Sequence, residues 1–302
     1  MDLPPDQDRP RPGARYYLWL VILLIPMLVM TACGGNSGAA WGPGSTQGNM
    51  STLPITQQGG LIILAAPALQ SVLPPMAEAF FQAHKLHVPY AFDFSNAKQI
   101  AMTTNTAADV DLLITDDRDV MVNARFLGFT RSVGSVIATD FLSVILPQSN
   151  PGKIRTLQDL ARPGLRYLGV SPMDGLNHHI RVALESMLLA PAFGPEYAAR
   201  VFGNLISNYT DGLVATQALA SPHPAGDFSI VYHTNYLEVT KQRGAQTLRQ
   251  LSIPAQFNPP VQMLAAIASR ANNPALAQQF IDFMRSPAGQ AIWARYGFQA
   301  AR

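Results

Sequence analysis

The pattern of apolar and polar residues divides the chain into three parts. Residues 16–30 are almost wholly apolar and follow three arginines. Residues 34–56 are rich in glycine and serine, and they carry too little apolar area to offset the entropy of ordering a chain. From about residue 57, apolar runs alternate with segments of helical spacing. We therefore expect a targeting segment, a flexible linker and a folded part.

Strands and helices are predicted to alternate in the folded part. A continuous apolar run predicts a strand that is covered on both faces at 61–66. Further strands are predicted at 88–94, 111–115, 141–147, 166–170, 228–232 and 261–267. Apolar residues at helical spacing predict helices at 69–80, 96–104, 175–189 and 211–220. Two C-terminal helices begin at Asn273-Pro274 and Ser286-Pro287, where a polar cap precedes proline, and the second stops at Gly297. This alternation predicts an α/β fold with mostly parallel sheet.

The alternation starts again after the strand at 141–147, which predicts two α/β lobes with a hinge between them. Two segments, near 140–147 and 259–265, would cross from one lobe to the other and allow closure by a hinge rotation. The predicted divisions are a signal peptide at 1–32, a linker at 33–56, the first part of lobe 1 at 57–139, lobe 2 at 140–258 and the second part of lobe 1 at 259–302.

Cys33 is the only cysteine in the chain, and it ends the apolar N-terminal stretch. The order of basic residues, short apolar run, small residues and cysteine resembles a bacterial lipobox, where the thiol is lipidated and becomes the new N-terminus. The alternative is a single-pass anchor that keeps its tail, although about 15 apolar residues are short for a membrane span. Either arrangement predicts a body outside the cytoplasmic membrane and tethered to it.

Composition excludes several classes of function. A formal net charge of +2 and 13% charged residues give no electrostatic footprint for nucleic acid. A lone cysteine allows no disulfide within the chain, so the fold depends on its core. With 48% hydrophobic residues, the folded part has the apolar area for one large core or two modest ones.

Several motifs resemble, in order and spacing, the molybdate-binding proteins of ABC importers. They are Ala65-Ala66-Pro67-Ala68-Leu69, Phe94-Ser95-Asn96-Ala97, residues 108–115, Ile230-Val231-Tyr232, and the C-terminal segments 280–287 and 290–298. The resemblance covers residues from about 60 to 298, and its C-terminal part is shared by several extracellular solute-binding families. It implies a type II periplasmic-binding-protein fold, whose two lobes close over a small ligand and whose closed form docks on a membrane permease.

The implied ligand is a small oxyanion of molybdate or tungstate type, delivered to an ABC permease and its ATPase by a monomeric protein without cofactor or metal. Such an anion is doubly negative, and helix N-termini can bind it with backbone N–H groups and no counter-ion. The turns at Ala68 and Ala97 follow predicted strands at the edge where α/β sheets bind ligands.

Carrying the family pattern over residue by residue gives six candidate ligand-binding positions: Ala68, Asn96, Ala97, Asn177, Thr210 and Tyr232. Ala68 and Ala97 stand where the family has ligating serines, so only their backbone N–H groups remain as donors. Two lost hydroxyls would weaken oxyanion binding by about two to four orders of magnitude, which leaves the identity of the ligand open.

Other interpretations remain beside this one. The turns could be ordinary β–α connections, and Tyr232 could be a half-buried strand tyrosine with its hydroxyl in water. His178-His179, near Asp174 and Ser171, invites a metal or enzyme hypothesis, but adjacent helical histidines point about 100° apart. No Gly-x-Ser-x-Gly elbow is present either, so we expect no enzyme. A lipid-anchored sensor that binds a different small solute, and not molybdate, is the main alternative.

Overall fold

The computed structural model describes residues 59–96, 99–100 and 109–301. The predicted signal peptide with Cys33, the linker, Ala97 and most of the predicted helix at 96–104 lie outside these residues. None of the helices in the described ranges has the length and apolarity needed to cross a bilayer.

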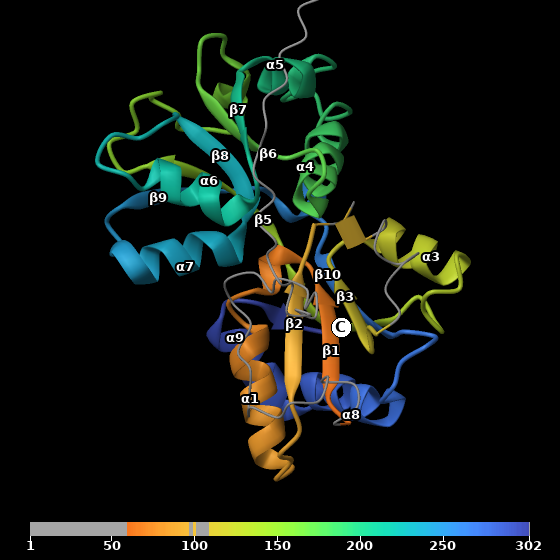
Figure 1. Cartoon of the computed structure of the whole chain (residues 1–302). Helices are drawn as coiled ribbons and strands as arrows, with labels where there is room; N and C mark the ends of the chain where they lie inside the picture. Colours follow the sequence, from red (N-terminus) through yellow and green to blue (C-terminus); the bar gives the residue numbers. More distant parts are fainter. Residues whose placement is uncertain (1–58, 97–98, 101–108, 302) are drawn as a thin grey trace, which may run out of the picture. The chain divides into compact units, whose positions relative to one another are not determined.

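The first half of the fold is a six-stranded sheet in the order β11-β4-β10-β3-β1-β2 (Figure 1). Its strands are β1 (Leu61–Ala65), β2 (Tyr90–Phe94), β3 (Leu112–Thr115), β4 (Ser135–Asp140), β10 (Val261–Ile267) and β11 (Gln299–Ala300). The helices that follow or join these strands are η2 (Pro67–Leu69), α1 (Leu73–Ala83), α3 (Arg118–Phe126), α8 (Pro274–Arg285) and α9 (Pro287–Arg295).

The second half is a five-stranded sheet in the order β7-β6-β8-β5-β9. Its strands are β5 (Leu142–Pro147), β6 (Tyr167–Val170), β7 (Leu205–Tyr209), β8 (Phe228–Tyr232) and β9 (Leu248–Ser252). Helices α4 (Gly175–Ser186), α5 (Tyr197–Gly203), α6 (Gly212–Leu219) and α7 (His233–Arg243), with the short η3 (Gln158–Ala161) and η4 (Ala255–Phe257), come from the same stretch of chain.

The α/β prediction is confirmed, but the sheets are mixed and not mostly parallel. In the first sheet β1 runs parallel to β2 and β3, whereas β10 runs antiparallel to β3 and β4. In the second, β6 runs parallel to β7 and β8, whereas β5 runs antiparallel to β8 and β9. The chain passes between the sheets at Phe141 and again between Ser252 and Val261, and the strands that flank these crossings supply the antiparallel pairs.

Strand β1 explains how the first sheet is held. All five of its residues are buried, as expected of a strand with both faces covered. Leu61, Ile63 and Ala65 belong to the large core cluster that also includes residues of α1 and α8. Ile62 and Leu64 face a smaller cluster with Val120 and Met121 of α3. Side chains of one strand alternate between two apolar layers, so the carboxyl end of β1 is fixed from both sides.

Candidate ligand site

A small cavity lies where helices from both sheets begin. Its volume is about 140 Å³, and it is lined by the starts of η2, α4, α6 and α7 with their caps: Pro67, Ala68, Gln70, Ser71, Asp174, Leu176, Asp211, Gly212, Leu213, Val214, Tyr232, Asn235 and Glu238. These positions follow the carboxyl ends of β1, β6, β7 and β8. Ligands of α/β proteins bind at such ends, so this cavity is the candidate site.

Two aspartates cap helices that begin at the cavity. The Asp174 carboxylate accepts a hydrogen bond from the Leu176 N–H at 2.9 Å, and the Asp211 carboxylate accepts one from the Val214 N–H at 2.9 Å. Each carboxylate satisfies a first-turn donor and lies at the positive end of the helix dipole. The N-terminal ends of α4 and α6 therefore already have carboxylates beside them.

Gly212, at the first position of α6, permits the close approach of three helices. A Cβ at this position would lie 2.5 Å from Asn235 Oδ1 and 2.6 Å from Leu176 Cδ2. A side chain at this position would therefore require the Asn235 or Leu176 side chain to move. Asn235 is buried, and its Oδ1 has no hydrogen-bond partner within the described chain. The cavity thus contains a buried polar atom that a ligand could satisfy.

Tyr232 joins the two sheets through a buried hydrogen bond. Its hydroxyl donates to Asp116 Oδ2 at 2.6 Å, and Asp116 directly follows β3 of the six-stranded sheet. His179 Nε2 of α4 donates to the backbone carbonyl of the same aspartate at 2.9 Å. Burial raises the pKa of Asp116 above its ordinary value, and burial beside this carboxylate raises the pKa of Tyr232. The hydroxyl that the sequence assigned to a ligand is engaged with a protein carboxylate.

Carboxyl groups set the electrostatics of the cavity. Burial, together with the neighbouring Asp116, raises the pKa of Asp174 to about 7. Asp140 lies at the end of β4, near Tyr232, and burial raises its pKa to about 7 as well. No lysine or arginine is among the cavity-lining residues of the described chain. A fully deprotonated oxyanion would enter an environment that already disfavours negative charge.

Two other hollows carry the cations that the cavity lacks. A hollow of about 370 Å³ shares Ala68, Ser71 and Glu238 with the cavity and is also lined by Lys241 and Arg295. Ser71 Oγ donates to Glu238 Oε2 at 2.7 Å, which links η2 to α7 along the shared wall.

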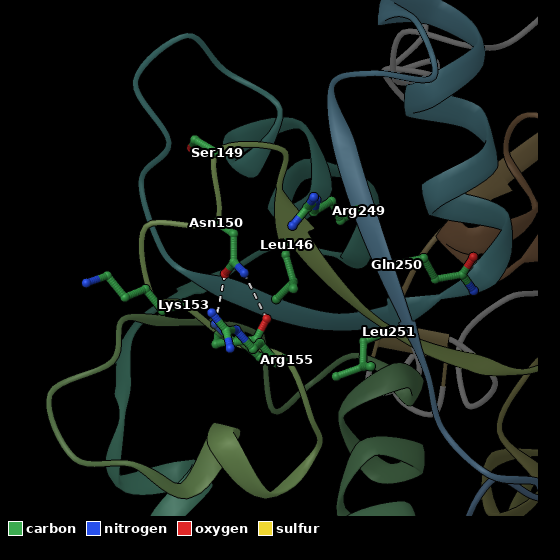
Figure 2. Close-up of a pocket in the computed structure, with 9 residues that line it drawn as sticks. Leu146, Ser149, Asn150, Lys153, Arg155, Arg249, Gln250 and Leu251 are labelled. Atoms are coloured by element: carbon green, nitrogen blue, oxygen red, sulfur yellow. Dashed lines mark hydrogen bonds between the residues drawn. The ribbon is translucent and has the colours of Figure 1, made fainter.

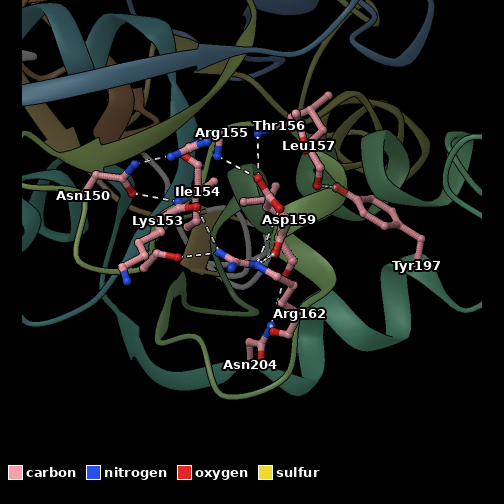
Figure 3. A network of polar contacts seen from close by, with 12 residues as sticks. Asn150, Lys153, Ile154, Arg155, Thr156, Leu157, Asp159, Arg162, Tyr197 and Asn204 are labelled. Carbon is pink, nitrogen blue, oxygen red and sulfur yellow. Dashed lines mark hydrogen bonds and ion pairs between the residues drawn. The ribbon is translucent and has the colours of Figure 1, made fainter.

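The third hollow is a groove on the five-stranded sheet alone (Figure 2). Its volume is about 700 Å³, and it is lined by the end of β5, the following loop and β9, with Lys153, Arg155 and Arg249. Beside it, the segment 150–162 is held by its own polar network (Figure 3). Because only one sheet lines the groove, a movement of the two sheets toward each other would not enclose a solute there.

The six predicted ligand positions fall in different places. Ala68 and Tyr232 line the cavity together. Asn96 and Asn177 are satisfied locally: Asn96 Oδ1 accepts from the Gln99 N–H at 3.0 Å, and Asn177 Nδ2 donates to the Val170 carbonyl at 3.2 Å. Thr210 is exposed, and its hydroxyl donates to Asp211, whose carboxylate lines the cavity. Ala97 lies outside the described residues. The ligand role of all six positions stays a prediction.

Sequence reasoning did not assign Asp116 or Asn235 to the site. The available signal for Asp116 was its place directly after a buried strand, at the edge where α/β sheets bind ligands. Asn235 gave no signal, because its helix was not predicted. The described ranges contain no group of three or more side chains that could hold a metal ion. His179 instead contacts Asp116, and the ring of His178 lies 5.5 Å from that of His179.

Comparison with known proteins identifies the family. A family model described as bacterial extracellular solute-binding protein matches residues 61–299. The chain belongs to this family. The curated molybdate-binding protein ModA of Mycobacterium tuberculosis is 27% identical over 281 residues, which cover 91% of this chain and 95% of the relative. Membership of an extracellular family indicates a place outside the cytoplasm.

Solved structures agree on the fold. The periplasmic molybdate-binding protein of Azotobacter vinelandii has a TM-score of 0.62 at 16% identity and covers 80% of this chain and 100% of its own. Iron-bound HitA of Pseudomonas aeruginosa has a TM-score of 0.63 at 17% identity, with 80% and 86% covered. The predicted periplasmic-binding-protein fold is therefore confirmed. These two relatives differ in what their names say they bind, so the fold by itself does not choose the ligand.

Proposed function

We propose that the chain is an extracytoplasmic solute-binding protein of an ABC importer that captures a small oxyanion of molybdate type and delivers it to a permease. The convergence of helix starts from both sheets on one cavity of about 140 Å³ carries this proposal. Backbone N–H groups at these starts are donors for an anion, and a space of this volume suits a solute of a few heavy atoms. The curated molybdate-binding relative supports the choice of anion.

The anchor completes the proposed function. Lipidation of Cys33 would tether the protein to the membrane that holds the permease, and the glycine-rich segment 34–56 would act as a flexible spacer. Closure of the two sheets over the solute would present a surface to the permease that the open form lacks.

Calorimetric titration of the protein with molybdate, tungstate, sulfate and phosphate tests solute capture. We expect one anion to bind per chain, with molybdate or tungstate preferred. Tyr232→Phe should weaken this binding about threefold or more, because a hydrogen bond to a charged ligand is lost. Tyr236→Phe is the matched control, since Tyr236 lies in the first turns of α7, directly after Tyr232, and does not line the cavity. An unchanged dissociation constant for Tyr232→Phe would remove its hydroxyl from the site.

A second candidate is a small solute that carries N–H or O–H donors, bound by a lipid-anchored binding or sensor protein without molybdate binding. The acceptors of the cavity favour it: Asp174, Asp211, Glu238 and the unpartnered Oδ1 of Asn235. A buried acceptor without a donor costs about 1–3 kcal/mol, and a ligand donor would recover it. This candidate would be selected if calorimetry detected no binding of the four anions but did detect binding of a small amine or amino acid from a panel of such compounds.

A further inference from the structure

Asp116 lies where a ligand would have to compete with it. Its carboxylate comes from the six-stranded sheet, yet its contacts are with the five-stranded side. Oδ2 accepts from the Tyr232 hydroxyl at 2.6 Å. Oδ1 lies over the first residue of α4, since a Cβ at Gly175 would come within 2.8 Å of it. One negative group therefore occupies the Tyr232 donor and the space directly at the start of a helix.

The Tyr232 hydroxyl and the start of α4 are the two features by which the five-stranded half would hold an oxyanion. A helix start favours negative charge, and a buried hydroxyl donates to it. Asp116 is 4% exposed, so water does not screen its carboxylate. The glycine at 175 is what admits the carboxylate, because any side chain at this position would displace it.

The surroundings of Asp116 give it little compensating positive charge. Burial raises the pKa of its carboxyl group, and His179 of α4, which donates to its backbone carbonyl, lowers that pKa by charge attraction. Against this one group stand three carboxyl groups that interact with Asp116: Asp117 on the same loop, Asp140 and Asp174. Asp174, at the start of α4, has its pKa raised by the nearby Asp116. It also raises the pKa of Tyr232, which contacts Asp116. A dianion added to this group would meet uncompensated like charge.

We propose that Asp116 is a specificity-determining residue, a built-in carboxylate that holds the Tyr232 hydroxyl and the space at Gly175 until a solute displaces it. A fully deprotonated oxyanion can bind only if the Tyr232 hydroxyl leaves Asp116. The Asp116 carboxylate must then either remain close to the anion or move away from Gly175. The residue thus weakens capture of dianions and favours solutes that bring a hydrogen-bond donor to Asp116. This inference rests on the proposed function, because it concerns the same cavity.

Titration of wild type and Asp116→Asn with sulfate and with molybdate at about pH 8 tests the proposal. Asparagine keeps the shape of the side chain and removes the charge. We expect Asp116→Asn to bind both anions at least about tenfold more tightly than wild type. Asp119→Asn is the matched control, because it removes the same charge from an exposed position in the next helix. It should leave both dissociation constants unchanged.

A double-mutant cycle adds a readout that a general loss of charge would not move. In wild type, the Tyr232 hydroxyl exchanges one anionic partner for another, so the loss in Tyr232→Phe should stay at about the threefold expected above. In the Asp116→Asn background the hydroxyl serves the ligand alone, and Tyr232→Phe should weaken anion binding more than it does in wild type. Equal losses in both backgrounds contradict the proposal.

A crystal structure of the wild-type protein with sulfate or molybdate gives an answer even if Asp116→Asn does not fold. The Tyr232 hydroxyl should then donate to the anion and no longer to Asp116. An anion bound in the cavity with the Tyr232–Asp116 bond intact overturns the proposal.

The titrations separate the failure of this proposal from that of the proposed function. Wild type that binds molybdate as tightly as Asp116→Asn overturns the role of Asp116 and leaves oxyanion capture standing. If wild type binds neither anion and Asp116→Asn does, the role of Asp116 is supported and oxyanion capture by the natural chain is refuted. If neither protein binds an anion, the role of Asp116 and the proposed function are both overturned.

Discussion

The cavity and the segment beside the groove use the same side chain in opposite ways. In the segment 150–162, Asp159 Oδ2 accepts from the backbone N–H groups of Arg155 and Thr156 at 2.8 and 2.9 Å, and these donors hold the pKa of its carboxyl below the ordinary value (Figure 3). At the cavity, burial raises the pKa of the lining residue Asp174 and of Asp116, which contacts the lining residue Tyr232. A carboxylate surrounded by donors contributes to folding, whereas one buried beside another carboxylate opposes it.

The difference separates a structural part of the molecule from a functional one. Segment 150–162 satisfies its polar groups internally: Asn150 donates to and accepts from Ile154, and the Tyr197 hydroxyl donates to the Leu157 carbonyl at 2.6 Å. The cavity leaves Asn235 Oδ1 unpartnered and keeps like charges together. Such a destabilising arrangement is typical of binding sites, where a ligand supplies the missing interactions.

Asp174→Asn should give the largest change in stability. Asparagine can still cap α4 at the Leu176 N–H, but it carries no buried charge. Because the pKa of Asp174 in the folded protein is above its ordinary value, ionising it costs the folded state more. This cost grows as pH rises from 3.8 and levels off above about 7. We expect a gain in the free energy of unfolding of at least about 2 kcal/mol at about pH 8, and a smaller gain at about pH 5.

Urea unfolding at both pH values measures the effect. Asp119→Asn serves again as the control, since it removes a carboxylate from an exposed position that does not line the cavity. Equal gains at the two pH values would mean that Asp174 is not the group whose ionisation opposes folding.

Asp159→Ala should have a smaller effect of opposite sign. The substitution leaves two backbone N–H groups without their carboxylate, so the free energy of unfolding at about pH 7 should fall by about 1–2 kcal/mol. The lowered pKa means that this contribution is present above the ordinary value of 3.8 and is lost as pH falls through the lower folded value. Gln158→Ala, at the exposed neighbouring position, is the control. An unchanged free energy of unfolding in Asp159→Ala would mean that apolar contacts, and not Asp159, stabilise the segment.

Neutralising the groove should have the smallest effect on solute binding. The triple variant Lys153→Gln, Arg155→Gln, Arg249→Gln removes the cations of the groove, and we expect the dissociation constant for the best-binding anion to change less than about twofold. These residues come from one sheet, and none of them lines the cavity. A large loss of affinity in calorimetry would transfer the site to the groove.

Much of the fold could be predicted from the sequence because its buried strands are continuous apolar runs. The predicted strands at 228–232 and 261–267 coincide with β8 and β10, whose residues are mostly buried. β7, by contrast, is an edge strand with four of its five residues exposed, and it is not a continuous apolar run, because Ser207 and Asn208 follow Leu205-Ile206. Helix α7 was missed because it begins directly after a strand with His233-Thr234-Asn235 and has few apolar residues.

The site was harder to predict than the fold. Ala68 and Tyr232 were placed by motif and meet at the cavity, because their local turns have a sequence signature. The partner of Tyr232 is 116 residues away in the chain, on the other sheet. No local pattern encodes such a contact, since it depends on how the chain crosses between the sheets. The contact between Asp116 and Tyr232 therefore becomes visible only in three dimensions.

The position of β10 in the six-stranded sheet sets an order for folding during synthesis. This strand lies between β3 and β4, although it is made after the whole five-stranded sheet. When the ribosome has completed β9, the five-stranded sheet has all of its strands, while the six-stranded sheet still lacks a central one. The half that begins the folded chain is therefore the half that finishes last: it lacks its central strand until Ile267 has emerged, and its edge strand β11 until Ala300 has emerged.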